Sequence, residues 1–179
     1  MKKIIISLLL AALLTAFCAC NDSGKEQSSA NDTDRAEIMG SVVETEAEDT
    51  YAFDIGGASV YVGENMADVL PLTGEPKSYF ESESCAFQGL DKVYTYSGYT
   101  IRTYPDGQDD YVLSIELRDD TVSTPEGVYI GDAESDVISA YGNPDEKGDG
   151  SVTYYKGGTA LTFIVGDDGC ISAITYTEK

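Results

Sequence analysis

The chain has 179 residues, of which 32 are acidic and 11 are basic, and its formal net charge at pH 7 is −21. This charge excludes nucleic acid and anionic lipid headgroups as partners, because binding them depends on Lys and Arg side chains that neutralise phosphate. The sequence contains no histidine, which excludes Ser-His and Cys-His catalytic pairs and removes the commonest zinc ligand.

The first element in chain order is a secretion signal at residues 1–19. Met1-Lys2-Lys3 is positively charged, residues 4–17 are apolar or small, and Ala19 precedes Cys20. This layout is typical of an exported protein. A small residue such as Ala19 suits processing before Cys20, whereas Phe17 is too bulky for processing before Cys18. We therefore expect the mature chain to begin at Cys20.

The signal resembles the lipobox of bacterial lipoproteins in part, and this resemblance implies a diacylglyceryl thioether on Cys20. Two acyl chains anchor a protein far better than one, since each buried methylene contributes about 0.8 kcal/mol. The expected location is the outer face of the cytoplasmic membrane. A plain cleaved signal and a permanent membrane helix remain as alternatives, although the apolar run is shorter than the roughly twenty residues that span a bilayer.

Residues 20–49 are expected to form a flexible acidic tether. They are rich in Asp, Glu, Ser, Asn and Thr and show no apolar periodicity. Such a segment buries too little surface to offset the entropy lost on ordering. Residues 50–179 are expected to fold as one domain.

The expected domain contains an internal repeat with a constant offset of 68 residues. Three matching pairs carry it, which are Tyr61-Val62-Gly63-Glu64 with Tyr129-Ile130-Gly131-Asp132, Asp68-Val69-Leu70 with Asp136-Val137-Ile138, and Gly74-Glu75-Pro76 with Gly142-Asn143-Pro144. Three matches at one offset favour duplication. The predicted repeats span about residues 58–118 and about residues 126–178.

Each repeat is predicted to contain a short helix followed by strands. The helices are expected at residues 64–72 and 133–141; Asp132 is expected to cap the second, and Pro71 to shorten or kink the first. Strands are expected at residues 92–96, 99–104, 111–118, 151–155, 159–165 and 170–176, with turns at Ser97-Gly98 and Gly157-Gly158. The fold prediction is α+β, with two tandem helix-plus-meander repeats of three to four antiparallel strands and the helices on one face of the sheet.

This doubled unit resembles the fold of the β-lactamase-inhibitor proteins and of the small outer-membrane-assembly lipoproteins of the SmpA/OmlA family. The residues that carry the resemblance are Gly131-Asp132, Asp136-Val137, Tyr141-Gly142-Asn143-Pro144 and the strand at residues 171–176. The chain is also similar to acidic lipoproteins of anaerobic Gram-positive bacteria, which share Ser84-Cys85-Ala86-Phe87 and Gly89-Leu90-Asp91-Lys92. The resemblance implies a protein-binding module without catalytic activity.

Two groups of residues are candidate sites in the domain. Cys85 and Cys170 either form a disulfide, as exported proteins permit, or remain free thiols. A tyrosine-lined sheet surface is a candidate for binding a protein partner, because tyrosine joins rigid apolar area to a hydrogen-bonding tip. The preference of tyrosine for β-strands explains its presence at these positions equally well. The tyrosines concerned are Tyr94, Tyr96, Tyr99, Tyr104, Tyr154 and Tyr155.

The favoured function is a non-catalytic binding or inhibitory module, held at the membrane through Cys20 and facing a protein partner in the cell envelope. No cofactor or metal is expected, since the acidic turns near Asp106 and Asp145 lack the ligand spacing of a calcium loop. A cation- or solute-sensing lipoprotein is the first alternative. A carboxylate-based enzyme that acts on cell-wall polymer is the second, and it requires two acids facing each other in a cleft.

Overall fold

The computed structural model describes residues 49–179. The predicted signal at residues 1–19, the predicted acylation site Cys20 and nearly all of the predicted tether lie outside the described residues. The elements in chain order are β1 (Phe53–Ile55), β2 (Ala58–Val60), α1 (Met66–Thr73), β3 (Ser78–Glu83), β4 (Leu90–Thr95), β5 (Tyr99–Asp106), β6 (Asp109–Leu117), α2 (Glu134–Tyr141), β7 (Glu146–Gly148), β8 (Ser151–Lys156), β9 (Thr159–Val165) and β10 (Ile171–Glu178).

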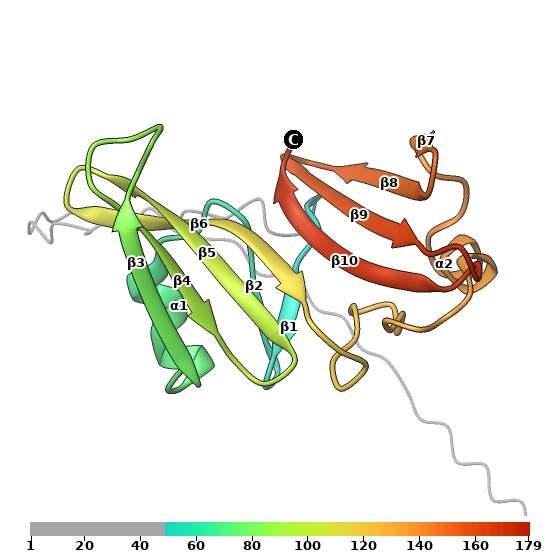
Figure 1. The fold of residues 1–179 in the computed structure, drawn as a ribbon, viewed down its shortest axis with the longest axis horizontal. Coiled ribbons are helices and arrows are strands. Elements are labelled where there is room, and N and C mark those ends of the chain that lie inside the picture. The colour runs from blue at the N-terminus through green and yellow to red at the C-terminus, as the bar shows by residue number, and fades with distance from the viewer. Residues whose placement is uncertain (1–48) are drawn as a thin grey trace, which may run out of the picture. The chain divides into compact units, whose positions relative to one another are not determined.

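One antiparallel sheet of eight strands dominates the described residues (Figure 1). Its strand order is β3-β4-β5-β6-β10-β9-β8-β7, so that β10, at the end of the chain, lies beside β6. We call the β6–β10 junction the seam. Its ladder contains only four residue pairs, from Leu117 opposite Ile174 to Ser114 opposite Thr177. Strands β1 and β2 form a separate hairpin, whose turn residues Gly56 and Gly57 both have positive φ, as a tight hairpin turn requires.

The predicted α+β fold of two helix-plus-meander repeats is wrong. The described chain is mainly β, with one large sheet, one hairpin and two helices of eight residues each. Pairing across the seam places the strands from both halves of the sequence in a single sheet. The six strands predicted from the sequence do occur within two residues of the expected positions, whereas β1, β2, β3 and β7 were not predicted.

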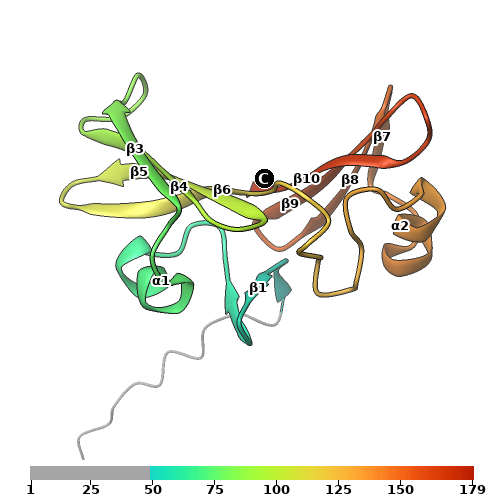
Figure 2. The ribbon, with the colours of Figure 1, turned by 60° about the horizontal axis from the view of Figure 1, so that its bottom comes forward.

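One face of the sheet is covered and the other is open (Figure 2). Helix α1, the β1–β2 hairpin and helix α2 all lie on the same side. Phe53 of the hairpin contacts sheet residues from both halves, with ring centroids 5.1 Å from Tyr99 and 6.1 Å from Tyr176. The hydrophobic core therefore lies between this layer and the sheet, and the opposite face is left without a covering element.

Local capping and turn residues define the two helices. The Asn65 side chain accepts a hydrogen bond from the Ala67 backbone N–H at 2.9 Å and caps α1. The predicted cap of α2 is wrong, because Asp132 instead accepts from the Tyr129 backbone N–H at 2.7 Å. Pro71 lies inside α1, which ends two residues later. Among residues 49–179 no helix has the length and apolar character needed to cross a bilayer.

Strand β6 contains an irregularity that changes which side chains face the core. Arg102 pairs with Ser114 and Thr103 pairs with Val112, so Leu113 has no partner on β5. An extra residue of this kind reverses the alternation of side chains beyond it. Val112 is consequently buried, while Leu113 is exposed. An uninterrupted alternation along β6 would turn Leu113 towards the core together with Ile115 and Leu117, and the bulge prevents this.

Candidate functional site

The six tyrosines of the predicted binding surface do not form one exposed patch. Tyr94, Tyr96, Tyr99 and Tyr154 are buried in the core on the covered face. Desolvation by this burial raises the pKa of Tyr99 to about 12. Only Tyr104 and Tyr155 are partly exposed, and β5 and β8, which carry them, are separated by three strands. These tyrosines therefore do not form the predicted binding surface, and four of the six are part of the hydrophobic core.

The open face presents a row of threonines instead. The register places Thr100, Glu116, Thr175, Thr162 and Thr153 side by side on consecutive strands, with Thr95 next to Thr100. Thr100 is buried, and the other five residues are partly exposed. The hydroxyl groups of Thr153 and Thr162 lie 3.0 Å apart. We call these six residues the threonine row, although its third member is Glu116.

Two arginines flank Glu116 on the open face. Arg102 Nε lies 3.7 Å from Glu116 Oε1, and Arg118 Nη1 lies 3.8 Å from Glu116 Oε2. Both distances exceed normal hydrogen-bond length, so one carboxylate does not saturate the donors of two guanidinium groups. The cluster has a net charge of +1 in a chain whose net charge is −21. It is a small positively charged cluster on the open face of the sheet.

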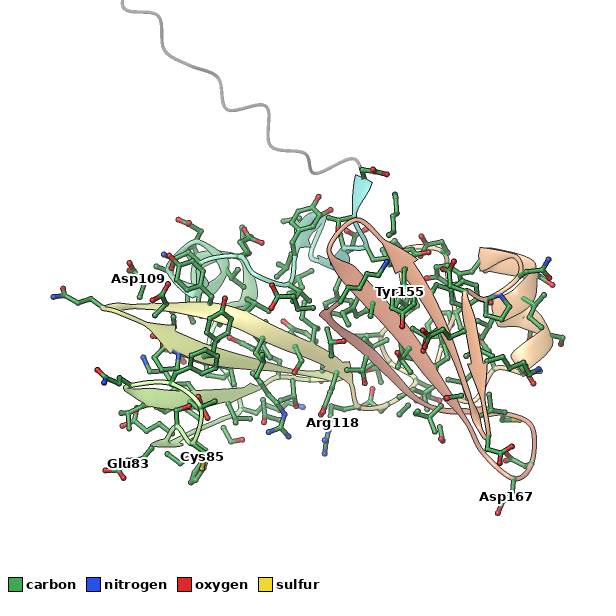
Figure 3. All side chains as sticks on the ribbon, turned by 90° about the horizontal axis from the view of Figure 1, so that it is seen from above. Glu83, Cys85, Asp109, Arg118, Tyr155 and Asp167 are labelled. Atoms are coloured by element: carbon green, nitrogen blue, oxygen red, sulfur yellow. The ribbon has the colours of Figure 1, made fainter. Side chains whose placement is uncertain are left out.

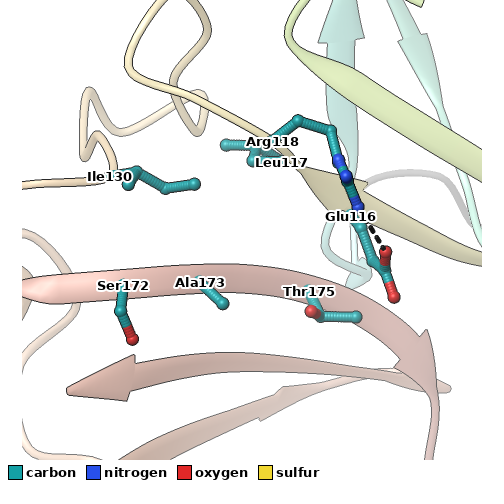
Figure 4. Close-up of a pocket in the computed structure, with 7 residues that line it drawn as sticks. All are labelled: Glu116, Leu117, Arg118, Ile130, Ser172, Ala173 and Thr175. Atoms are coloured by element: carbon teal, nitrogen blue, oxygen red, sulfur yellow. Dashed lines mark ion pairs between the residues drawn. The ribbon is translucent and has the colours of Figure 1, made fainter. Parts of the chain in front are cut away.

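A hollow lies beside this cluster at the seam (Figure 4). Its volume is about 270 Å³, and its lining includes Arg118, Glu116, Ile130, Ser172 and Thr175. The hollow begins where the β6–β10 ladder ends at Leu117 and Ile174. Its volume is slightly below the range typical of small-molecule pockets. It accordingly suits one or two side chains of a docked protein better than a whole cofactor.

The two cysteines lie far apart in the sheet. Cys85 follows the edge strand β3, and Cys170 immediately precedes β10; both are free thiols. Glu83 and Cys85 lie at one end of the sheet, and Asp167, near Cys170 in the chain, lies at the other (Figure 3). The four strand spacings between β3 and β10 correspond to about 19 Å, well beyond disulfide reach. Of the two alternatives for Cys85 and Cys170, a disulfide or free thiols, this structure has free thiols.

The acidic turns are used in local structure. Asp145 accepts a hydrogen bond from the Tyr155 backbone N–H at 2.7 Å, and Asp110 forms an ion pair with Lys92. The part of the chain that the structure describes contains no group of three or more potential metal-ligating side chains. The site with the clearest chemical character in this part of the chain is thus the arginine-flanked hollow.

Sequence reasoning did not single out Arg102, Glu116 or Arg118. One signal was available, because the sequence contains only three arginines and two of them lie in neighbouring predicted strands. Comparison of the chain with models of protein families, with characterised proteins and with solved structures finds no match. The resemblance to the β-lactamase-inhibitor proteins and to the SmpA/OmlA lipoproteins is therefore not supported by any of these comparisons.

Proposed function

We propose that this protein is a lipid-anchored, extracytoplasmic binding module without catalytic activity, which docks a protein partner on the open face of its sheet. The anchor rests on the sequence around Cys20, where an apolar run ends at Ala19 and an acidic, polar segment follows. A diacylglyceryl group on Cys20 holds the module at the outer face of the membrane, and the acidic segment separates the folded part from the lipid surface.

The observation that carries the binding proposal is the Arg102–Glu116–Arg118 cluster on a sheet face that no described element covers. Buried faces stabilise a fold, whereas an open face with an unsaturated charge cluster provides contact area and specificity for a partner. The partner inferred from this chemistry presents an Asp or Glu side chain to the hollow. A bidentate contact between that carboxylate and an arginine gives both energy and orientation.

The surrounding charge supports specificity for one acidic group in a defined position. The chain as a whole repels acidic proteins, since its net charge is −21. A partner must therefore place a single carboxylate at the arginine cluster while keeping the rest of its contact surface neutral or basic. Arg102 and Arg118 attract that group, and the partly exposed threonines of the threonine row, mostly on the β10 side of the seam, supply neutral contact area.

Site-specific photo-crosslinking in the producing cells tests this proposal. A photoreactive amino acid at Ser172 places the probe in the hollow, and the same probe at Asp68, an exposed residue of α1, places it on the covered side. We expect a discrete crosslinked partner from position 172 and not from position 68. Mass spectrometry of the product then identifies the partner and the crosslinked segment, which we expect to contain Asp or Glu.

Charge reversal provides the matched control. The double substitution Arg102→Glu with Arg118→Glu is expected to abolish the crosslink at position 172, because three acidic groups then meet at the hollow. Lys147→Glu makes a charge reversal on edge strand β7, where Lys147 is exposed and pairs with Glu134, and is expected to leave the crosslink unchanged. Equal crosslinking from position 68, or a product that survives the double reversal, contradicts the proposal.

A further inference from the structure

Strand β3 is an open edge of the sheet. It occupies one end of the strand order, and all six of its residues are exposed. The Ser84 N–H donates to the Gly89 carbonyl at 3.0 Å on the β4 side. Because backbone groups alternate along an antiparallel strand, Ser82, Phe80 and Ser78 also face β4. The N–H and C=O groups of Tyr79, Glu81 and Glu83 consequently point outward and are available to another strand.

The other edge of the sheet differs from β3. Strand β7 has only three residues, includes Lys147 and ends at Gly148. Short length and lysine are common ways to prevent pairing at an edge. Strand β3 has six residues without proline, lysine or a bulge. It also carries two exposed aromatic side chains, Tyr79 at 48% and Phe80 at 63% exposure. Only one of the two edges is therefore suited to pairing.

The sequence of this edge is complementary to itself when read antiparallel. With Phe80 placed opposite Phe80 of a second copy, Tyr79 lies opposite Glu81 and Ser78 lies opposite Ser82. In the same register the Lys77 side chain, one residue before β3, comes near Glu83 of the second copy. The Lys77 backbone N–H takes no part in the edge pairing, because it donates to the Thr95 carbonyl at 2.8 Å on the β4 side, and Lys77 Nζ must leave Ser97 Oγ, to which it donates at 3.1 Å. We propose that two copies of this chain pair through β3 in this register, so that their two sheets become one continuous sheet.

The proposed register agrees with the backbone pattern. Tyr79 and Glu81 both present their N–H and C=O groups outward, so each copy's Tyr79 forms a hydrogen-bonded pair with the other copy's Glu81. Phe80 then occupies a non-hydrogen-bonded position, where facing side chains come closest, and the two rings meet on the open face. The exposed Tyr79 hydroxyl already donates to Glu81 within one chain at 2.5 Å, which shows that these two side chains are chemically matched.

Other registers bring like charges together. Shifting the centre from Phe80 to Glu81 places the two Glu81 carboxylates opposite each other and removes Lys77 from Glu83. Shifting it to Tyr79 places Glu83 opposite Glu75, which lies before β3, and Lys77 opposite Glu81, while each Phe80 then faces Ser78. Like charges directly opposite each other destabilise a strand pair, and this cost is large for a chain whose net charge is −21. Charge therefore disfavours the Glu81-centred register, and of the remaining two only the Phe80-centred register brings the two exposed Phe80 rings together.

Disulfide trapping of the full chain in a mild detergent tests the register. In a Cys85→Ser background, Phe80→Cys is expected to give an intermolecular disulfide on mild oxidation, because the two positions face each other. Ser82→Cys is the matched control, since it is exposed on the same face of the same strand. Two copies of residue 82 are separated by four residue positions, or about 13 Å. We therefore expect no disulfide from Ser82→Cys, and equal yields from the two variants overturn the proposal.

Charge swaps test the same pairing without cysteine. The interface is small, so we expect a dissociation constant on the order of micromolar by sedimentation equilibrium. Lys77→Glu is expected to weaken the dimer roughly tenfold, since each dimer loses two ion pairs and gains two repulsions. The double variant Lys77→Glu with Glu83→Lys restores both pairs and is expected to recover wild-type affinity. A chain that remains monomeric at about 1 mM, or a double variant as weak as the single one, contradicts the dimer.

This inference stands apart from the proposed function. The arginine-flanked hollow lies at the seam, three strands away from β3. Loss of the dimer in Lys77→Glu is therefore expected to leave the photo-crosslink at position 172 in place. Conversely, the double reversal of Arg102 and Arg118 is expected to leave the dimer intact, so that each proposal can fail without the other.

Discussion

Leu117 of β6 lies directly opposite Ile174 of β10, and this pair ends the short ladder that joins the two parts of the sheet. Leu117 is 3% exposed and Ile174 is 0% exposed. Phe53 of the β1–β2 hairpin bridges the same region by contacting Tyr99 and Tyr176. The seam is therefore held by packing of apolar side chains on the covered face as well as by its few backbone hydrogen bonds.

Ile174→Ala is expected to lower the free energy of unfolding by about 3 kcal/mol, because it removes buried methylene groups and leaves a cavity at the seam. Urea unfolding followed by circular dichroism measures the change. Ser172→Ala, two residues earlier on the same strand but exposed, is expected to change stability by less than about 0.5 kcal/mol. A similar small effect for both substitutions would show that the seam does not depend on this packing.

Removing the hydroxyl group is expected to have opposite effects on stability at Tyr176 and at Tyr154. The buried Tyr176 hydroxyl has no hydrogen-bond partner among the described residues, whereas the Tyr154 hydroxyl donates to the Gly142 carbonyl at 3.0 Å. Tyr176→Phe is expected to be neutral or stabilising by up to about 1 kcal/mol, and Tyr154→Phe to be destabilising by about 1 kcal/mol. Thermal unfolding of the two variants checks this difference, and the reverse order contradicts it.

Lys92 and Asp110 form a partly buried ion pair on the covered face between β4 and β6. Their side chains are 23% and 18% exposed, and the hydrogen bond to Asp110 raises the pKa of Lys92. Asp110→Asn is expected to cost about 1–2 kcal/mol of stability, between the values of exposed and buried pairs. A double-mutant cycle with Lys92→Met isolates the coupling, and additive effects of the two substitutions would show that the pair contributes nothing.

Local sequence signals were sufficient to locate most of the strands. Gly98 and Gly157 mark tight turns between segments of alternating polarity, and the neighbouring strands β4, β5, β8 and β9 occur close to where they were expected. Strand β3 was not expected, because Ser78–Glu83 lies at an edge where all of its side chains are exposed. An edge strand with no buried face has no alternation for a sequence analysis to detect.

Relationships between distant residues could not be predicted in this way. The two halves of the sequence were predicted as two repeats within one domain, and nothing in the sequence indicated that the Leu117–Ile174 pair joins their strands in one sheet. The alternation of side chains along β5 predicts that the strand has two different faces, but it does not show which face the helices cover. Tyr99, which is buried, was therefore assigned to the predicted binding surface. The position of Arg102 beside Glu116 depends on the strand register and on the bulge at Leu113, and both are set by tertiary structure.

Cys20 is expected to carry the lipid that retains the protein at the membrane. Cys20→Ser should move the protein from the detergent phase to the aqueous phase in detergent-partitioning experiments, because both acyl chains are lost. Cys18→Ser is the matched control and is expected to leave partitioning unchanged. Mass spectrometry of the first peptide of the mature wild-type chain is expected to show a diacylglyceryl adduct, and an unmodified Cys20 would disprove the anchor.

Buried tyrosines predict that the fold is lost at alkaline pH. Desolvation by burial raises the pKa of Tyr99 from 10.0 to about 12 and also raises that of Tyr176. A raised pKa means that the unfolded chain releases the phenolic proton first, so the stability from these groups is complete below about pH 10 and declines as pH rises towards about 12.

We expect the urea midpoint to fall across this window and the ultraviolet absorbance of tyrosinate to rise together with unfolding. Tyr99→Phe should flatten the decline, whereas Tyr129→Phe, at an exposed position, should leave it unchanged. Ionisation of all tyrosines near pH 10 without unfolding would show that burial does not protect them.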